Sequence, residues 1–263
     1  MRRVPSNAVI ASPPDAVRTV PTCAWCEQPL AHGPLRAFGQ LRCDHCGATT
    51  ALDWPAERDL VRVPLLPAVQ MRGTHRICTL GEAARRRARR RLAMRIARVA
   101  PPGPVLDVSS GDGLLLDALR ATGRLTTGIV SGQSEAATRA GIQQTEITEL
   151  GGRYAAIVFW QSLGRLRAPG VALDHAAALL KPGGLLAIAQ PSPTRLQARA
   201  IGERFVAPGL PRHRVLIPPQ TLMERLRALG LQVDRIDHLL DLPTPGGWLQ
   251  SVLGGVTAVE ARR

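Results

Sequence analysis

Short apolar runs alternate with segments of helical periodicity over most of the chain after residue 80. Runs of Val, Ile and Leu bounded by Gly or Pro predict strands, and apolar residues three and four positions apart predict helices. Strands are expected at 105–108, 125–130, 142–147, 154–160, 185–189, 232–238 and 256–260, and helices at 81–100, from 114 onward, 134–140, 171–180 and 220–229. Strands that alternate with helices favour a parallel sheet covered on both faces. The pattern therefore predicts an α/β fold with a doubly wound, seven-stranded sheet.

The first of these strands runs directly into a glycine-bearing turn and then into a helix, in the segment PVLDVSSGDGLLLDALRATG at 104–123. Asp107 stands at the end of the strand. Gly111 and Gly113 allow a sharp bend and leave room for a ligand against the main chain. A plain strand-to-helix turn also uses such glycines, so the loop alone is compatible with a binding site and with a structural connection.

Two CxxC pairs, Cys23 with Cys26 and Cys43 with Cys46, lie sixteen residues apart near the N-terminus. This spacing is typical of a structural zinc site with four thiolate ligands. The segment 21–53 has too little apolar content to fold alone, and a tetrahedral metal would supply the missing stability. We predict a zinc ribbon here. Two disulfides are the alternative, which a reducing cytoplasm disfavours, and four sulfurs leave no open position for a catalytic water.

The other segments before the main α/β region show little periodicity. Residues 1–20 are interrupted by prolines and are expected to be a flexible tail, 54–80 is interpreted as a proline-rich linker, and 81–263 as the main domain. No apolar stretch is long enough to span a membrane, and no secretion signal is recognisable. We therefore expect a cytoplasmic protein, and the sequence carries no signal for an oligomeric state.

The net charge of +14 is concentrated most densely in the predicted helix 81–100, where six arginines occupy 85–87 and 89–91. Such a surface favours an anionic partner, for example RNA. Because Lys181 is the only lysine, the arginine content also fits a coding bias, and the run also fits a solvated helix face. An aromatic content of 3% argues against binding single strands by base stacking.

Several segments resemble class I S-adenosylmethionine-dependent methyltransferases. DVSSGDG at 107–113 is similar to the family's first motif, an acidic residue followed by alternating glycines, with Ser109 in place of the first glycine. YAAIVFWQSLGRL and ALLKPGGLLAIAQPSP look like its fourth strand and the turn into its fifth. LPRHRVLIPPQTLMERLRALGLQV resembles a segment that covers the substrate pocket in a subgroup. The resemblance implies S-adenosylmethionine as cofactor and a last strand inserted antiparallel beside the sixth.

The resemblance implies roles for residues on the cofactor side, and side-chain chemistry suggests roles for residues on the acceptor side. Glu146 is expected near the adenine amino group and Ile147 against the adenine ring, although an exposed surface charge is the alternative for Glu146. Gln161 and Ser162 would orient the acceptor. His213 is the candidate general base, and a structural histidine is its alternative. The loop residues expected against the cofactor are Asp107, Ser109, Gly111 and Gly113.

The chain departs from the family pattern at four positions. Val130 replaces the acid that usually binds both ribose hydroxyls, Ala155 replaces an aspartate, and Gly164 and Arg165 replace a common Glu-His pair. Hydrogen bonds to a buried charged group are worth roughly 1.5–3 kcal/mol. We therefore expect the missing acid at Val130 to weaken cofactor binding.

Three functions follow from these patterns. The first, which we predict, is methyl transfer to a small-molecule acceptor such as a sugar, a lipid-linked intermediate or a natural product, with the ribbon in a structural or substrate-positioning role. The second is RNA methylation that uses the ribbon and the arginine-rich helix. The third is a catalytically inactive, methyltransferase-like binding protein, which the four departures would favour.

Overall fold

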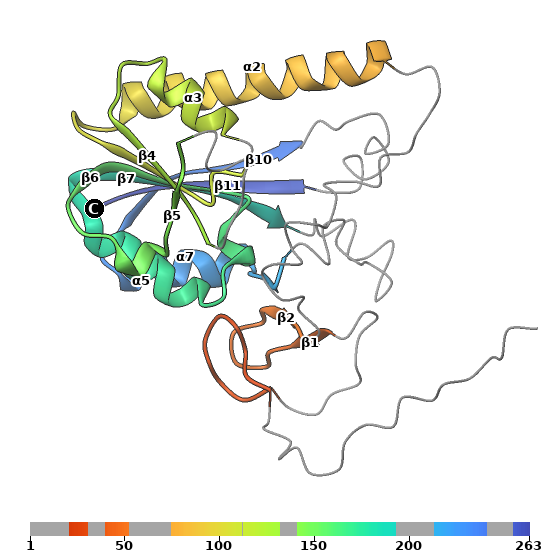
Figure 1. The fold of residues 1–263 in the computed structure, drawn as a ribbon. Helices are drawn as coiled ribbons and strands as arrows, with labels where there is room; N and C mark the ends of the chain where they lie inside the picture. Colours follow the sequence, from red (N-terminus) through yellow and green to blue (C-terminus); the bar gives the residue numbers. More distant parts are fainter. Residues whose placement is uncertain are drawn as a thin grey trace, which may run out of the picture.

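The computed structural model describes residues 21–30, 40–52, 75–111, 113–131, 141–192, 213–240 and 255–263. These residues form a seven-stranded sheet with helices on both faces and a separate three-stranded sheet (Figure 1). The predicted tail, the predicted helix at 134–140 and most of the predicted linker lie outside the described residues. Within the described residues, no helix combines the length and apolar character needed to cross a membrane.

The large sheet has the strand order β10-β11-β7-β6-β3-β4-β5. Strands β3 to β7 run parallel to one another, whereas β11 is inserted between β10 and β7 and runs antiparallel to both. This confirms the predicted seven strands and the inserted last strand. The strands are β3 (Val105–Val108), β4 (Thr126–Val130), β5 (Gln143–Gln144), β6 (Tyr154–Trp160), β7 (Leu180–Ser192), β10 (Gln232–Leu240) and β11 (Gly255–Arg262).

The central strands are buried on both faces. Every residue of β3 and six of the seven in β6 are buried, which explains why these strands are continuous apolar runs in the sequence. Alternate residues of β6 enter different clusters, because successive side chains of a strand point to opposite faces. Ala156 and Val158 pack on one side of the sheet, and Ile157 and Phe159 on the other.

Among the described residues, four α-helices cover the two faces of the sheet. Helices α2 (His75–Val99) and α3 (Leu114–Arg120) lie on one face, and α5 (Pro169–Leu179) and α7 (Pro219–Ala228) lie on the other (Figure 1). Both α5 and α7 begin at a proline. Proline lacks an N–H, which costs nothing at a helix start because the first N–H groups have no acceptor within the helix. Helix α2 begins six residues before the predicted start at 81.

Arginine side chains fix the position of α2. The guanidinium of Arg124 donates to the carbonyl oxygens of Ala97 (2.7 Å), in the last turn of the helix, and Ala100 (2.9 Å), the residue after it. Carbonyls at a helix C-terminus lack a partner within the helix. Arg95 forms a bidentate ion pair with Glu260 of β11, with Nη2 and Oε2 2.6 Å apart. The helix is therefore anchored to the sheet at its C-terminal half.

The predicted strand at 142–147 is shorter in the structure. Strand β5 has two residues, and Ile147–Glu149 forms a 3-10 helix, η1. The Glu149 carboxylate accepts hydrogen bonds from the Thr145 hydroxyl and, at 3.4 Å, from the Glu146 N–H. These bonds start the helical turn. Among the described residues β5 is the edge strand, and its two residues pair with Ile129 and Val130, so little strand pairing opposes the turn.

Strand β7 is longer than predicted and includes the expected turn at 181–184. Its pairing with β6 shifts register, because Tyr154 pairs with Leu180 but Ala156 pairs with Leu185. The extra residues form a bulge in the strand. Their backbone is satisfied from elsewhere, since the Gly183 N–H donates to the Arg263 carbonyl (3.1 Å) and the Arg263 N–H donates to that of Gly184 (3.2 Å).

The small sheet joins the N-terminal region to the main fold. Strands β1 (Gln40–Arg42), β2 (Thr49–Ala51) and β9 (Val215–Leu216) pair antiparallel in the order β1-β2-β9. Strand β9 was not predicted from the sequence. The two regions also share one apolar core, in which Trp25 and Leu41 belong to the same cluster as Leu173 of α5 and Leu222 of α7.

Candidate functional site

The carboxyl ends of three neighbouring parallel strands meet around Asp107. This residue lies in β3 between β4 and β6, paired with Gly128 on one side and Val158 on the other, and it is 2% exposed. In open α/β sheets, ligands bind outside the carboxyl ends of the strands. The structure therefore places the predicted acidic residue at the carboxyl edge of the sheet, at its centre.

The loop after β3 contains three residues with left-handed backbone: Ser109 (φ 59°), Gly111 (φ 58°) and Gly113 (φ 74°). Ser109 keeps this conformation although it carries a Cβ, which costs roughly 1–2 kcal/mol. Gly111 is exposed, and a Cβ built on it would have its nearest neighbour at 3.7 Å. The main chain at Gly111 is thus not covered by other described residues, and its contact with a cofactor stays a prediction.

Ser110 holds the loop in place. Its hydroxyl donates to the Asp107 carbonyl (2.9 Å) and its N–H to the Ile129 carbonyl (3.1 Å). Gly128 in β4 allows this approach, because a Cβ there would lie 2.6 Å from the Ser110 Oγ. Sequence reasoning missed Gly128, although a glycine inside a predicted strand is a known sign of close backbone approach.

The residues at or just after the ends of the neighbouring strands β4 and β5 differ in solvent exposure. Val130, where the family places a ribose-binding acid, is half-buried and packs against Leu116 and Ile142. Glu146 is exposed at the start of η1, and Ile147 is 2% exposed within the larger core cluster. The structure thus leaves the Glu146 carboxylate accessible, while the Ile147 side chain packs among protein side chains.

At the end of β6, Gln161 also has left-handed backbone (φ 54°), and its N–H donates to the Ala189 carbonyl at 2.6 Å. Ser162 is 1% exposed, and its Oγ has no hydrogen-bond partner among the described residues. The Arg89 guanidinium of α2 lies 4.5 Å from the ring centroid of Trp160, the last residue of β6. A cation stacked on a ring in this way is attracted by the ring quadrupole, so an arginine of the arginine-rich helix reaches the carboxyl edge of the sheet.

The next segment, the 3-10 helix η2 (Leu163–Arg165), packs against the residues that precede and form β9. A Cβ on Gly164 would lie 2.4 Å from the Val215 carbonyl oxygen and 3.4 Å from the His213 Cδ2. Glycine at 164 is therefore required for β9 to reach η2, which gives a structural reason for this departure from the family pattern. His213 itself is 6% exposed.

Two arginines near this contact are half-buried. Burial lowers the pKa of Arg165, and burial together with the nearby charge of Arg167 lowers the pKa of Arg214. Among the described residues, no carboxylate forms an ion pair with these three arginines. This side of the site is therefore cationic.

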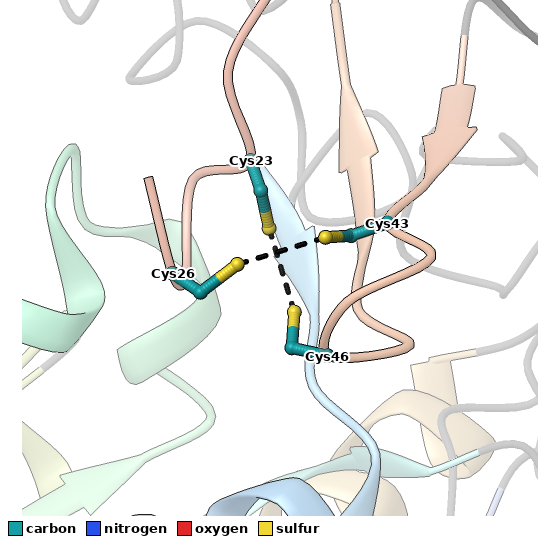
Figure 2. Close-up of side chains that lie close together, drawn as sticks. All are labelled: Cys23, Cys26, Cys43 and Cys46. Carbon is teal, nitrogen blue, oxygen red and sulfur yellow. Dashed lines mark hydrogen bonds between the residues drawn. The ribbon is translucent and has the colours of Figure 1, made fainter. Parts of the chain in front are cut away.

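The four predicted cysteines converge in the N-terminal region (Figure 2). Their Sγ atoms all lie within 4.8 Å of one another, and the Cys23–Cys46 and Cys26–Cys43 Sγ pairs are each 3.6 Å apart. A disulfide needs about 2.05 Å between sulfurs. Four sulfurs bound at about 2.3 Å to a tetrahedral zinc are about 3.8 Å apart. The donor set and its spacing fit a tetrahedral thiophilic ion and suggest zinc.

Backbone and hydroxyl donors surround the sulfurs. The Trp25 N–H donates to the Cys23 Sγ (3.5 Å), and Thr50, which accepts from the Ala24 N–H, directs its hydroxyl to the same sulfur (3.9 Å). Burial raises the pKa of Cys26. At Cys43 burial acts in the same direction, but backbone N–H groups and neighbouring thiols outweigh it and lower the pKa. Such donors stabilise the thiolates that metal binding requires.

A model of the family described as "Methyltransferase domain" matches residues 82–236. The chain is 29% identical over 168 residues to the ubiquinone biosynthesis O-methyltransferase of Xanthomonas campestris pv. campestris, a match that covers 56% of this chain and 70% of that protein.

Among solved structures, magnesium protoporphyrin IX methyltransferase from Synechocystis PCC 6803 with bound SAH has a TM-score of 0.52 and 17% identity, covering 74% of this chain and 89% of that one. The cyclase SpnF has a TM-score of 0.51 and 19% identity, covering 66% and 80%. These likenesses show the fold, and the family match spans more than half of the chain. The chain therefore belongs to the methyltransferase domain family and is a class I S-adenosylmethionine-dependent methyltransferase.

Proposed function

We propose that the protein transfers a methyl group from S-adenosylmethionine to a small-molecule acceptor at the carboxyl ends of β3 and β6. The observation that carries this proposal is a pair of strained, left-handed residues, Ser109 and Gln161, each of which directly follows one of these adjacent strands. The buried Asp107 lies in the first of them. Such strain persists mainly at functional sites. The names of the two methyltransferases compared above, for ubiquinone biosynthesis and magnesium protoporphyrin IX, also refer to small molecules.

The cofactor would bind along the loop after β3, with Asp107, Ser109, Gly111 and Gly113 against its methionine and ribose parts and Glu146 near its adenine. When bound, S-adenosylmethionine supplies a methyl group that its sulfonium has made electrophilic. The chain's own residues then have to align the acceptor, exclude water and take up a proton where the acceptor loses one.

On the acceptor side, the Gln161 amide and the Ser162 hydroxyl would orient the reacting atom. His213 would be the general base, because histidine is the side chain best suited to accept a proton near neutral pH. The contact of His213 with Gly164 supports this role, since it holds the ring against the segment that follows β6.

Calorimetric titration with S-adenosylhomocysteine, the stable product, tests the cofactor half of the proposal. We expect saturable binding that is weaker than in relatives with an acid at the Val130 position. A titration without heat, together with no thermal shift at millimolar cofactor, would contradict the proposal.

RNA methylation is a second candidate, favoured by the exposed arginines on α2: Arg86, Arg87, Arg90 and Arg91. Phosphate contacts make binding strongly dependent on salt. RNA affinity that falls steeply as salt rises would support this function. Indifference to RNA at low salt would exclude it and leave the small-molecule acceptor.

A further inference from the structure

The strand that completes the small sheet carries part of the proposed acceptor site. Thr49 pairs with Leu216 and Thr50 with Val215, and the Ala51 N–H donates to the Arg214 carbonyl at 2.8 Å. The candidate base, His213, immediately precedes this paired stretch. The N-terminal region therefore contacts the backbone on which the proposed catalytic side chain is mounted.

A short series of contacts links the cysteine cluster to the end of β6. The Thr50 hydroxyl contacts the Cys23 sulfur (3.9 Å), and the Thr50 backbone pairs with Val215. The Val215 carbonyl in turn lies so close to Gly164 that it excludes any Cβ there. Three contacts thus connect a metal ligand with η2.

The N-terminal region also contacts the first turns of two helices, α5 and α7. The Thr221 hydroxyl of α7 donates to the Cys46 carbonyl at 2.7 Å. At α5, a Cβ on Gly170 would lie 2.8 Å from the Trp25 carbonyl oxygen. These contacts hold the cysteine turns against α5 and α7, and β9 pairs with the strand that follows the second turn.

Neither β9 nor the N-terminal region that it pairs with is stable by itself. Strand β9 has two residues, and a small region with two short strands cannot bury enough apolar surface to fold without further stabilisation. A bound metal supplies that stabilisation as folding free energy. We propose that metal binding to the four cysteines positions His213 for the acceptor, so that the ribbon forms a wall of the acceptor site. The role of His213 in this inference rests on the proposed function.

Hydrogen exchange on the whole protein, with zinc bound and after chelation, tests the inference. Zinc loss is expected to speed exchange at 213–217 by at least about tenfold, the factor for 1.4 kcal/mol, and to leave exchange at 105–111 within twofold. Binding of S-adenosylhomocysteine should stay within twofold. Unchanged exchange at 213–217 after verified zinc loss would overturn the inference, as would an equal rise at 105–111.

A pair of threonine variants tests it without removing the metal. Thr221→Val deletes the hydroxyl bond to the Cys46 carbonyl, whereas Thr122→Val deletes a comparable bond, 2.6 Å to the Leu119 carbonyl, at the end of α3. We expect exchange at 213–217 to rise about fivefold in the first variant, as one lost hydrogen bond implies, and to stay unchanged in the second. Equal effects would contradict the inference.

The two proposals fail separately. If S-adenosylhomocysteine does not bind, the proposed function is wrong, yet the exchange data still decide whether the metal controls 213–217. If the cofactor binds but zinc loss leaves 213–217 protected, the proposed function stands and the ribbon is excluded from the acceptor site.

Different atoms carry a second inference, about the chemistry of the acceptor. The Nε of Arg214, one residue after His213, is fully enclosed and has no hydrogen-bond partner among the described residues. Arg167 lies close enough to repel it, and the described residues supply no carboxylate to either arginine. A half-buried guanidinium without a counter-charge is costly, and a bound anion would offset that cost. We infer that the acceptor carries an anionic group, a carboxylate or a phosphate, bound by Arg214.

Titrations with inorganic phosphate and with benzoate, on the intact zinc-bound protein, test this inference. Arg214→Gln should weaken binding at least about tenfold, as the loss of a hydrogen bond to a charged group implies. Arg227→Gln removes the same charge from the exposed surface of α7 and should change binding less than twofold. Tighter binding of phosphate would identify a phosphate group on the acceptor, and tighter binding of benzoate would identify a carboxylate. No saturable binding of either probe, or equal loss in both variants, would overturn the inference.

Discussion

The loop after β3 and the cysteine cluster both present ligand-binding atoms on tight turns, but they are stabilised in different ways. The loop is one continuous stretch, and Ser110 ties it to its own strand through the Asp107 carbonyl and to the next strand through the Ile129 carbonyl. The cysteine cluster needs two separate turns and a strand, β9, from a segment about 165 residues further along the chain.

This difference shows where each site obtains its rigidity. The loop is attached to strands buried on both faces, so core packing holds it whether or not a ligand is present. The cysteine turns rest on a minimal sheet and on side chains shared with α5 and α7. We therefore expect the ribbon to depend on its metal and the loop to be independent of it.

The largest effect should come from breaking the ribbon. Cys43→Ser removes one of four thiolates, and a structural zinc site contributes on the order of 10 kcal/mol to folding of its region. We expect about one zinc per chain in the wild type and almost none in the variant, with exchange protection lost at 40–52 and kept in β3 and β6. Metal analysis and hydrogen exchange measure both quantities.

Cys78→Ser is the matched control, because Cys78 lies outside the two CxxC pairs. This variant should keep its zinc. Loss of protection throughout the large sheet in Cys43→Ser would show that the two regions are not independent.

The next largest effect should fall on the loop. Asp107→Asn neutralises a carboxylate that is 2% exposed at the proposed cofactor site. Binding of S-adenosylhomocysteine should weaken at least about tenfold, because a hydrogen bond to a charged group contributes roughly 1.5–3 kcal/mol. Calorimetry measures the affinity, and zinc content should not change.

Asp117→Asn makes the same neutral change at an exposed aspartate of α3, which pairs with Arg120 on the surface. Cofactor affinity should be unaffected there. If Asp107→Asn binds the ligand as tightly as this control does, the cofactor site has been misplaced.

A smaller effect is expected at the contact between η2 of the main fold and β9 of the small sheet. Gly164→Ala would place a methyl group 2.4 Å from the Val215 carbonyl, so β9 must shift. Overpacking of this kind costs roughly 1–3 kcal/mol. Urea unfolding should show this loss, and exchange at 213–217 should increase.

Gly151→Ala provides the control, because a Cβ there would meet no atom within 4 Å. Its stability should stay within about 0.5 kcal/mol of wild type. A Gly164→Ala variant as stable as Gly151→Ala would mean that the contact between η2 and β9 is not close in solution.

The smallest effect should follow from relieving strain in the loop. Ser109→Gly removes a Cβ from a left-handed residue, a gain of roughly 1–2 kcal/mol, while glycine increases the entropy of the unfolded chain by roughly 0.5–1 kcal/mol. The net gain of about 0.5 kcal/mol should raise Tm by about 1–2 °C. Ser131→Gly, at a position without positive φ, should lower it. Equal shifts in both variants would argue against strain at Ser109.

The sequence pattern predicted those features that depend on a short stretch of chain or on a fixed residue spacing. Strand β6 has the predicted bounds, because a fully buried parallel strand must be a continuous apolar run. The cysteines could be found because zinc ligands follow a fixed spacing. The start of α2 was predicted too late, at 81, because the apolar spacing becomes clear only after the helix has begun.

Other features could not be predicted, since they depend on contacts between distant segments. Strand β9 exists because β2 offers it a pairing edge, and two residues carry no period of their own. In the sequence, Gly164 is a departure from the Glu-His pair common in the family, and the close approach of the Val215 carbonyl explains the glycine.

The amino-acid sequence by itself determined the sheet, the glycine loop and the four-cysteine pattern, because burial, backbone freedom and the spacing of paired cysteines are properties of short segments. The tertiary structure alone decided that the ribbon shares a strand with the main fold next to His213. The physical reason is that the backbone N–H and C=O groups of a strand can pair with any backbone that the fold brings within hydrogen-bonding distance. The sequence of a short strand therefore does not determine which segment it pairs with.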